Sequence, residues 1–199
     1  MTDDRLRRQM EFCLEADKEK QIMRHTFKSN GIDRENDAEH AWHMAVMCLL
    51  LGEYANEPVD MLRTISMILI HDVVEIDAGD TFAYDEQANT TRQEREQRAA
   101  DRLFGILPPD QGEKLRALWD EFEAGETAEA RFARAMDNIQ PAMLNFATDG
   151  KAWTESGVRL SQILKRNEIT PKGSKKLWEH SLGTFILPNV EKGRIIDDK

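Results

Sequence analysis

Cysteine is scarce in this chain, and its scarcity excludes one common way of stabilising a fold. The 199 residues include two cysteines, Cys13 and Cys48, too few for a disulfide framework. Cys48 lies inside the apolar run 44–51, where a free thiol behaves as a small hydrophobic side chain. We therefore expect a cytoplasmic protein that relies on a hydrophobic core.

Long hydrophobic runs are also missing. The longest apolar stretches stop well short of the roughly 20 residues that a membrane-spanning helix needs. The first residues, 1–5, are mostly polar and lack the basic start and apolar centre of a signal peptide. We expect a soluble protein without a membrane partner.

Positive charge is in short supply. The chain has 27 lysines and arginines against 37 aspartates and glutamates, a formal net charge of −10 at pH 7. Nucleic acids and anionic membranes are polyanions and repel such a surface. The charge argues against a nucleic-acid partner, and any anionic substrate needs a local positive site.

Alternating β-branched stretches bounded by hairpin turns are absent, whereas apolar residues recur at helical spacing along most of the chain. The sequence therefore predicts an all-α fold, and its length fits a single domain over residues 1–199. Loops are expected at 24–36 and 79–89, and a frayed tail at 195–199. Helices are expected over residues 4–23, 37–55, 58–76, 91–104, 109–123, 127–146, 154–166 and 170–185.

Helix-start signals place the residues that carry chemistry. Asn36 and Glu39 have the spacing of a capping box, so a helix should begin there with His40 in its first turn. Pro58 suits the first turn of the next helix, which would end near His71 and Asp72. The spacing Thr91-x-x-Glu94 suggests another cap.

The adjacent pair His71-Asp72 points to a metal ion. On a helix the two side chains diverge by about 100°, so they converge only on something lying between them, just off the surface. Glu75 shares their face and could hold a water. His40 and Asp137 lie in mostly apolar stretches, where a shared ion would offset the cost of their burial. Two imidazoles and two carboxylates suit borderline divalent ions and leave positions for water and substrate.

The order His40, His71-Asp72, Asp137 in three separate helices resembles the H…HD…D signature of the HD-domain metal phosphohydrolases. The surrounding stretches are similar to the branch that contains the bacterial 5′-deoxynucleotidases. They span residues 34–43, 71–80 and 135–141, and the whole resemblance covers about 24–145.

This resemblance implies a fold and a function. The fold would be an HD-domain helical bundle with a core of about 24–145, flanking N- and C-terminal helices and a mononuclear metal site in the core. The expected activity is metal-dependent release of phosphate from (deoxy)nucleoside 5′-monophosphates. Members of the family are commonly dimers, so a homodimer is expected. The implied cofactor is one divalent ion, among Mn, Co, Ni, Fe, Zn and Mg, with the ligands His40, His71, Asp72 and Asp137.

The family also implies roles for further residues. Glu75 would orient or deprotonate the attacking water, and Asp80 would assist it or protonate the leaving 5′-oxygen. By motif position, Arg24, Lys28 and Arg95 are the candidates for binding phosphate. Deoxynucleotidases have an Arg-Trp pair in this loop where this chain has Arg24 followed by His25, a departure that bears on the preference for deoxyribose.

Other readings remain open at this stage. Two-metal phosphodiesterases and di-iron oxygenases need additional histidines between the HD pair and the last aspartate, and none lies between His71 and His180, which favours a mononuclear phosphomonoesterase over these two classes. The ester could be a different phosphorylated small molecule. A non-catalytic helical interaction module would hold a closed, structural ion. His43 is expected to pack or to support His40, and His180 to lie at the surface.

Overall fold

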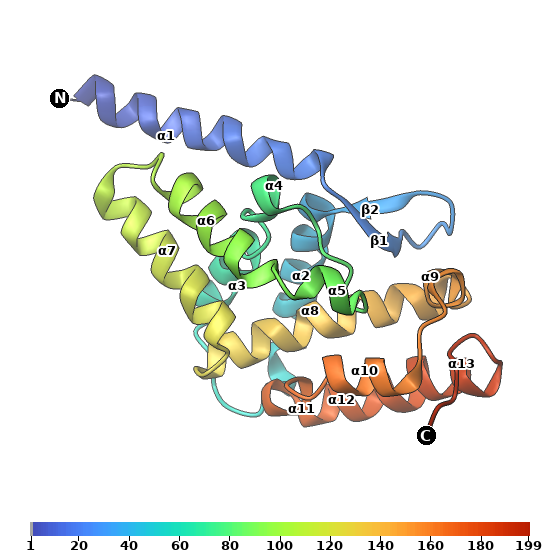
Figure 1. Ribbon diagram of the computed structural model, residues 1–199. Coiled ribbons are helices and arrows are strands. Elements are labelled where there is room, and N and C mark those ends of the chain that lie inside the picture. Colours follow the sequence, from blue (N-terminus) through green and yellow to red (C-terminus); the bar gives the residue numbers. More distant parts are fainter. Residues whose placement is uncertain (1) are drawn as a thin grey trace.

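Helices dominate the computed structural model, which describes residues 2–199 (Figure 1). The predicted all-α class is confirmed, apart from one two-stranded sheet. The strands are β1 (Met23–Phe27) and β2 (Arg34–Asn36). The α-helices are α1 (Thr2–Ala16), α2 (Asp37–Leu51), α3 (Met61–Ile70), α4 (Glu75–Ala78), α5 (Glu86–Asn89), α6 (Arg92–Phe104), α7 (Pro109–Ala124), α8 (Ala128–Ala147), α9 (Lys151–Ser156), α10 (Leu160–Arg166), α11 (Thr170–Gly173), α12 (Lys175–Ser181) and α13 (Leu187–Glu191).

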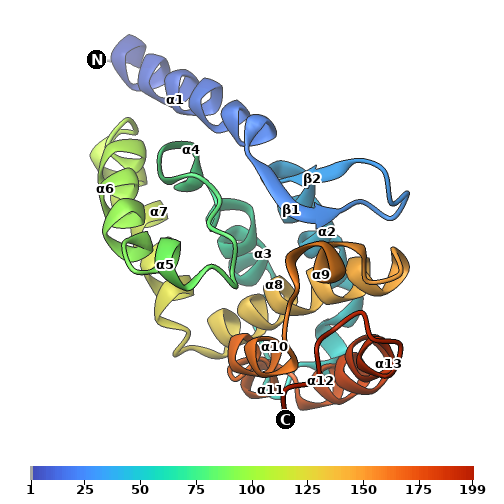
Figure 2. The same ribbon diagram turned by 45° about the vertical axis from the view of Figure 1, so that its right-hand side comes forward.

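Helix α8 forms the centre of the main core. Its buried side chains, including Phe132 and Met136, pack against Met44 of α2 and Met67 of α3. Thr127, at the predicted start of this helix, caps it by accepting a hydrogen bond from the backbone N–H of Ala130. Figure 2 shows α8 running between α3 and the C-terminal helices. In the part of the chain that the structure describes, no helix is long and apolar enough to cross a membrane.

The first helix is shorter than predicted, and the expected loop at 24–36 is a hairpin. Helix α1 ends at Ala16, and a 3-10 turn, η1 (Asp17–Gln21), leads into β1. The two strands pair antiparallel with Met23 opposite Asn36. The sheet is held by hydrogen bonds between backbone groups of the two strands. Its residues are mostly polar, so their composition did not predict strands.

The helix expected over 58–76 is interrupted. Helix α3 ends at Ile70, and the chain turns through His71 to Val74 before the single turn of α4. Val73 and Val74 are buried in a second apolar cluster together with Leu103 and Trp119. Burying both valines in this cluster favours the turn over a straight helix.

Two further local predictions are wrong. The expected loop at 79–89 contains α5, which Asp85 caps with its side chain. Helix α6 does begin after Thr91, but the Thr91 side chain makes no capping hydrogen bond. The spacing of Thr91 and Glu94 therefore predicted where this helix begins, but the capping hydrogen bond that it also predicted is not formed.

The C-terminal third is broken into short helices rather than the two that were predicted. Gly157, with φ of +59°, separates α9 from α10. After α11 and α12, a π-helical turn, η3 (Leu182–Ile186), leads into α13. The tail is not frayed, because Ile195 is 1% exposed. It packs in a third cluster with Trp153 and Ile163.

Candidate metal centre

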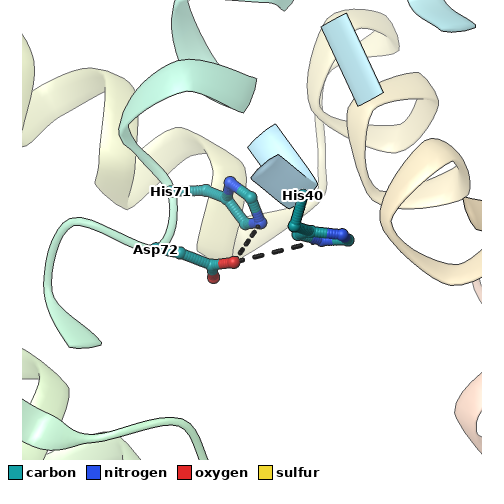
Figure 3. Close-up of side chains that lie close together, drawn as sticks. All are labelled: His40, His71 and Asp72. Carbon is teal, nitrogen blue, oxygen red and sulfur yellow. Dashed lines mark ion pairs between the residues drawn. The ribbon is translucent and has the colours of Figure 1, made fainter. Parts of the chain in front are cut away.

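Three helical segments bring the predicted ligands together at one buried place. His40 lies in the first turn of α2, where the predicted capping box of Asn36 and Glu39 is formed. His71 and Asp72 follow α3 directly. Figure 3 shows His40, His71 and Asp72 pointing toward one another, and each offers a ligand atom within 4.8 Å of the others.

Asp137 of α8 completes the predicted set. Its Oδ1 lies 3.2 Å from Nε2 of His40 and 3.9 Å from Nε2 of His71. Its Oδ2 accepts a hydrogen bond from Arg166 at 2.9 Å. The structure therefore brings all four predicted ligands together, with one oxygen of Asp137 facing the histidines and the other held by an arginine.

His71 presents an unused nitrogen to this centre. Its Nδ1–H donates to the carbonyl of Ile68 at 2.7 Å, so in the neutral ring the lone pair is on Nε2. This Nε2 is buried, and it has no hydrogen-bond partner among the described residues. It lies 3.0 Å from Oδ2 of Asp72. Burial lowers the pKa of His71, but the charge and hydrogen bonding of Asp72, the charge of Asp137 and the hydrogen bond to Ile68 together outweigh burial and raise it to about 9.

His40 is oriented by a buried amide. Its Nδ1 lies 3.0 Å from Oε1 of Gln140, which can only accept, so Nδ1 carries the proton and Nε2 faces Asp137. The amide nitrogen of Gln140 donates to Glu35 at 2.7 Å and lies 3.0 Å from Nδ1 of His43. His43 thus supports His40 through Gln140, in keeping with the supporting role predicted for it.

Arg24 neutralises a second group of carboxylates. Oxygens of Asp37, Asp72 and Glu75 also approach within 4.8 Å of one another. The Arg24 guanidinium donates to Asp72 at 2.7 Å and to Asp37 at 3.0 Å. Burial raises the pKa of Asp37 to about 7 even with this partner.

The two predicted catalytic carboxylates lie beside the ligands in a setting that favours their neutral forms. Glu75 is 4% exposed, and one of its oxygens has no hydrogen-bond partner. Burial, reinforced by the charge of Asp72, raises its pKa well above the ordinary value. Burial also raises the pKa of Asp80. Groups with such shifts in a cavity are typical of acid–base sites.

Two cavities meet at this centre. The smaller is lined by His71, Asp72 and Glu75. The larger extends from Asp137 to the indole of Trp153. The candidate ligands therefore border space that a substrate can enter.

Of the three predicted phosphate-binding residues, Arg24 alone lies at the two cavities. Arg24 lines both cavities. Lys28 pairs with Glu39 at 2.5 Å, and Arg95 donates to the carbonyl of Ala78 and to Thr81. Neither Lys28 nor Arg95 lines these two cavities, so the structure gives them no support as phosphate ligands.

Two residues at the centre escaped the sequence prediction. Arg166 lies outside residues 24–145, which carry the family resemblance. Gln140 lies inside the stretch 135–141, but it is uncharged and was not considered as a site residue. One available signal for Gln140 was its spacing of three residues after Asp137, which puts both on one face of α8. Arg166 carried no local signal. His180, which was expected at the surface, is exposed and contacts Phe185.

The donor set fits a divalent metal ion. Two imidazole nitrogens and two carboxylates surround one buried place, and the Nε2 atoms of both histidines face the carboxylates of Asp72 and Asp137. Nitrogen and oxygen donors in this ratio suit Mn, Fe, Co, Ni or Zn. The residues present are therefore those that a mononuclear site requires.

Comparisons with known proteins agree with this geometry. The chain is 31% identical over 106 residues to the 5′-deoxynucleotidase HDDC2 of Bos taurus and 28% identical over 106 residues to that of Homo sapiens. These alignments cover 53% of this chain and 50% of each relative, so the chain spans about half the length of the curated relatives it matches.

A solved structure is similar along almost the whole chain. The crystal structure of a predicted metal-dependent phosphohydrolase from Magnetospirillum magnetotacticum MS-1 superposes with a TM-score of 0.92 at 47% sequence identity, covering 98% of this chain and 97% of that one. The HD domain family matches residues 16–178. The resemblance inferred from the sequence is confirmed: the chain belongs to the HD domain family.

Proposed function

We propose that this chain is a divalent-metal-dependent phosphomonoesterase that releases phosphate from nucleoside 5′-monophosphates. One ion would be held by His40, His71, Asp72 and Asp137. The observation that carries the proposal is the convergence of His40, His71, Asp72 and Asp137 at one buried place, where Nε2 of His71 lies 3.0 Å from Asp72 and 3.9 Å from Asp137. The name of the solved relative, a metal-dependent phosphohydrolase, points the same way.

The chemistry divides between the ion and two carboxyl groups. A divalent ion bound there supplies Lewis acidity toward phosphate oxygens and toward water. Glu75 accepts the proton of the attacking water as the new bond to phosphorus forms. Asp80, whose raised pKa favours its protonated form, donates a proton to the ester oxygen as that bond breaks. Positive charge at the ligands favours the carboxylate form of Glu75 that this step needs.

A nucleoside suits the larger cavity. Phe82, Tyr84 and Trp153 give it an aromatic wall, and Asp137 lies at the metal end. Aromatic walls of this kind receive planar rings. The relatives' name, 5′-deoxynucleotidase, supports the same class of substrate. His25, which stands in place of a tryptophan, packs against Phe82 with ring centroids 4.3 Å apart, so we expect sugar selection to differ from that of enzymes with the Arg-Trp pair.

The test is phosphate release from a panel of deoxy- and ribonucleoside 5′-monophosphates. Metal-stripped protein is resupplied with Mn, Co, Ni, Fe, Zn or Mg, and Asp72→Ala and Glu75→Gln are assayed beside the wild type. We expect Asp72→Ala to lose both metal and activity. Glu75→Gln should keep the metal and lose about 10²- to 10⁴-fold in kcat.

The control is Asp77→Asn, which changes a carboxylate two residues from Glu75 that pairs with Arg102. It should behave as wild type. Folded wild-type protein that binds an ion but hydrolyses none of these esters would refute the proposal. A structural ion in a non-catalytic module would then be the better account.

We also propose that the enzyme is a cytoplasmic homodimer without nucleic-acid or membrane partners. Large apolar side chains are exposed on α2 and α3, among them Trp42, Leu49 and Leu62. A second copy could cover them. Light scattering that gives the 22.9 kDa of one chain would contradict the dimer.

A further inference from the structure

We propose that Arg166, on helix α10 in the C-terminal third of the chain, binds the phosphate group of the substrate. This role rests on the proposed phosphomonoesterase function and names a residue that its motifs do not contain. It follows from the position of Arg166, from the partners of the other cations near the centre, and from the charge that the substrate brings.

Arg166 lies where the cavities meet. It lines both the cavity beside His71 and Asp72 and the larger one that reaches Trp153. Its guanidinium is 2.9 Å from Oδ2 of Asp137, the oxygen that is not directed at the histidines. A phosphate near Asp137 with its organic part in the larger cavity would therefore lie within reach of this guanidinium.

The other arginines at the centre are committed elsewhere. Arg24 is enclosed by Asp37 and Asp72, with a side chain that is 12% exposed. Arg92 and Arg134 line only the smaller cavity, where they donate to Glu96 and to the backbone carbonyl of Glu123. Of the arginines that line both cavities, Arg24 and Arg166, only Arg24 is held by two carboxylates.

Arg166 has donors to spare. In residues 2–199 its one recorded side-chain hydrogen bond is to Asp137, and a guanidinium has five N–H donors. Its side chain is 29% exposed, more than twice the exposure of Arg24. It can thus keep Asp137 in place while its remaining donors form the paired hydrogen bonds that guanidinium groups make with phosphate.

The charge of the centre favours such a cation. Asp72 and Asp137 are carboxylates, and a phosphate monoester adds about 1.5 to 2 further negative charges near neutral pH. One divalent ion offsets only part of this total. A guanidinium at the cavity junction supplies the missing positive charge where the anion sits.

Helix α10 is held firmly enough for this task. Its first residue, Leu160, donates its backbone N–H to the carbonyl of Ile196 in the tail at 2.9 Å. At its other end, Asn167 accepts from Thr170, which in turn accepts from Asn138 of α8. These contacts fix the helix that carries Arg166 against the helix that carries Asp137.

The experiment measures binding of inorganic phosphate, independently of turnover, to full-length protein saturated with Mn²⁺. Calorimetry is carried out on wild type, Arg166→Met and Arg166→Lys, with metal content and melting temperature recorded for each. The matched control is Arg159→Met, which removes an exposed arginine from the start of the same helix.

Arg166→Met should weaken phosphate binding by about 10- to 100-fold at full Mn²⁺ occupancy, because charge-assisted hydrogen bonds are lost. The phosphate affinity of Arg166→Lys should lie between those of wild type and Arg166→Met, since lysine keeps the charge but lacks the paired donors. Arg159→Met should match wild type. If the ester is hydrolysed, KM should rise in Arg166→Met.

Three results would overturn the proposal. The first is phosphate affinity in Arg166→Met equal to wild type. The second is parallel loss of Mn²⁺ and phosphate, which would limit Arg166 to orienting Asp137. The third is Mn²⁺-loaded wild type that binds no phosphate. Wild type that binds phosphate through Arg166 but hydrolyses no ester would refute the proposed function while leaving this anion site established.

Discussion

Buried polar side chains form a connected network behind His40. Gln140 is fully buried and joins His40 to Glu35 and His43. When the amide oxygen of Gln140 accepts from His40, its amide nitrogen is directed at Glu35 and His43. The hydrogen bonds on the two sides of the amide therefore fix its orientation together. The network determines which imidazole nitrogen faces Asp137.

A first prediction concerns this network. Gln140→Met removes the acceptor for His40 Nδ1 at similar side-chain volume, so divalent-metal affinity should fall by about 10- to 100-fold. Competition with a fluorescent chelator measures it. Gln111→Met is the control, because Gln111 bonds to Gln9 and lines neither cavity of the centre. Unchanged affinity in Gln140→Met would mean that the network does not orient His40.

At the scale of elements, sequence signals succeeded where a helix is defined by its own residues. The capping box of Asn36 placed His40 in the first turn of α2, and the helix predicted over 127–146 matches α8. The hairpin of β1 and β2 and the turn at His71 were not predicted, because pairing and burial by distant residues decided them. The helix break at Gly157 was missed as well.

The tail provides an element-scale prediction. Ile195 is 1% exposed in the cluster that contains Trp153 and Ile163, whereas its neighbour Ile196 is 51% exposed. Ile195→Ala should lower the free energy of unfolding by about 2–5 kcal/mol because it opens a cavity. Ile196→Ala should lower the free energy of unfolding by well under half as much as Ile195→Ala. Urea unfolding of both variants measures the difference, and equal losses would mean that the tail is not part of the core.

For the whole molecule, burial of acidic groups near the centre makes the free energy of unfolding depend on pH. Glu19, in η1, is 8% exposed, and burial raises its pKa to about 8. The unfolded chain should titrate this group near its ordinary value of 4.5. Between these two values the folded state holds a proton that the unfolded state has lost, so the contribution of Glu19 to stability decreases as pH rises.

Comparison with Glu19→Gln isolates this effect. In metal-free protein, wild type should lose stability relative to Glu19→Gln between pH 5 and 8, by on the order of 2 kcal/mol. Urea unfolding in the presence of a chelator, at several pH values, gives the difference. A difference that stays constant with pH would show that Glu19 titrates alike in both states.

The sequence by itself determined the helical class and the identity of the four candidate ligands. Apolar spacing and capping residues act over a few positions, and the order of His40, His71-Asp72 and Asp137 is a property of the chain alone. The tertiary structure decided the hairpin, the packed tail and the approach of Arg166 to Asp137. These features depend on partners distant along the chain, such as Arg159 and Ile196, and local patterns carry no information about which distant groups will meet.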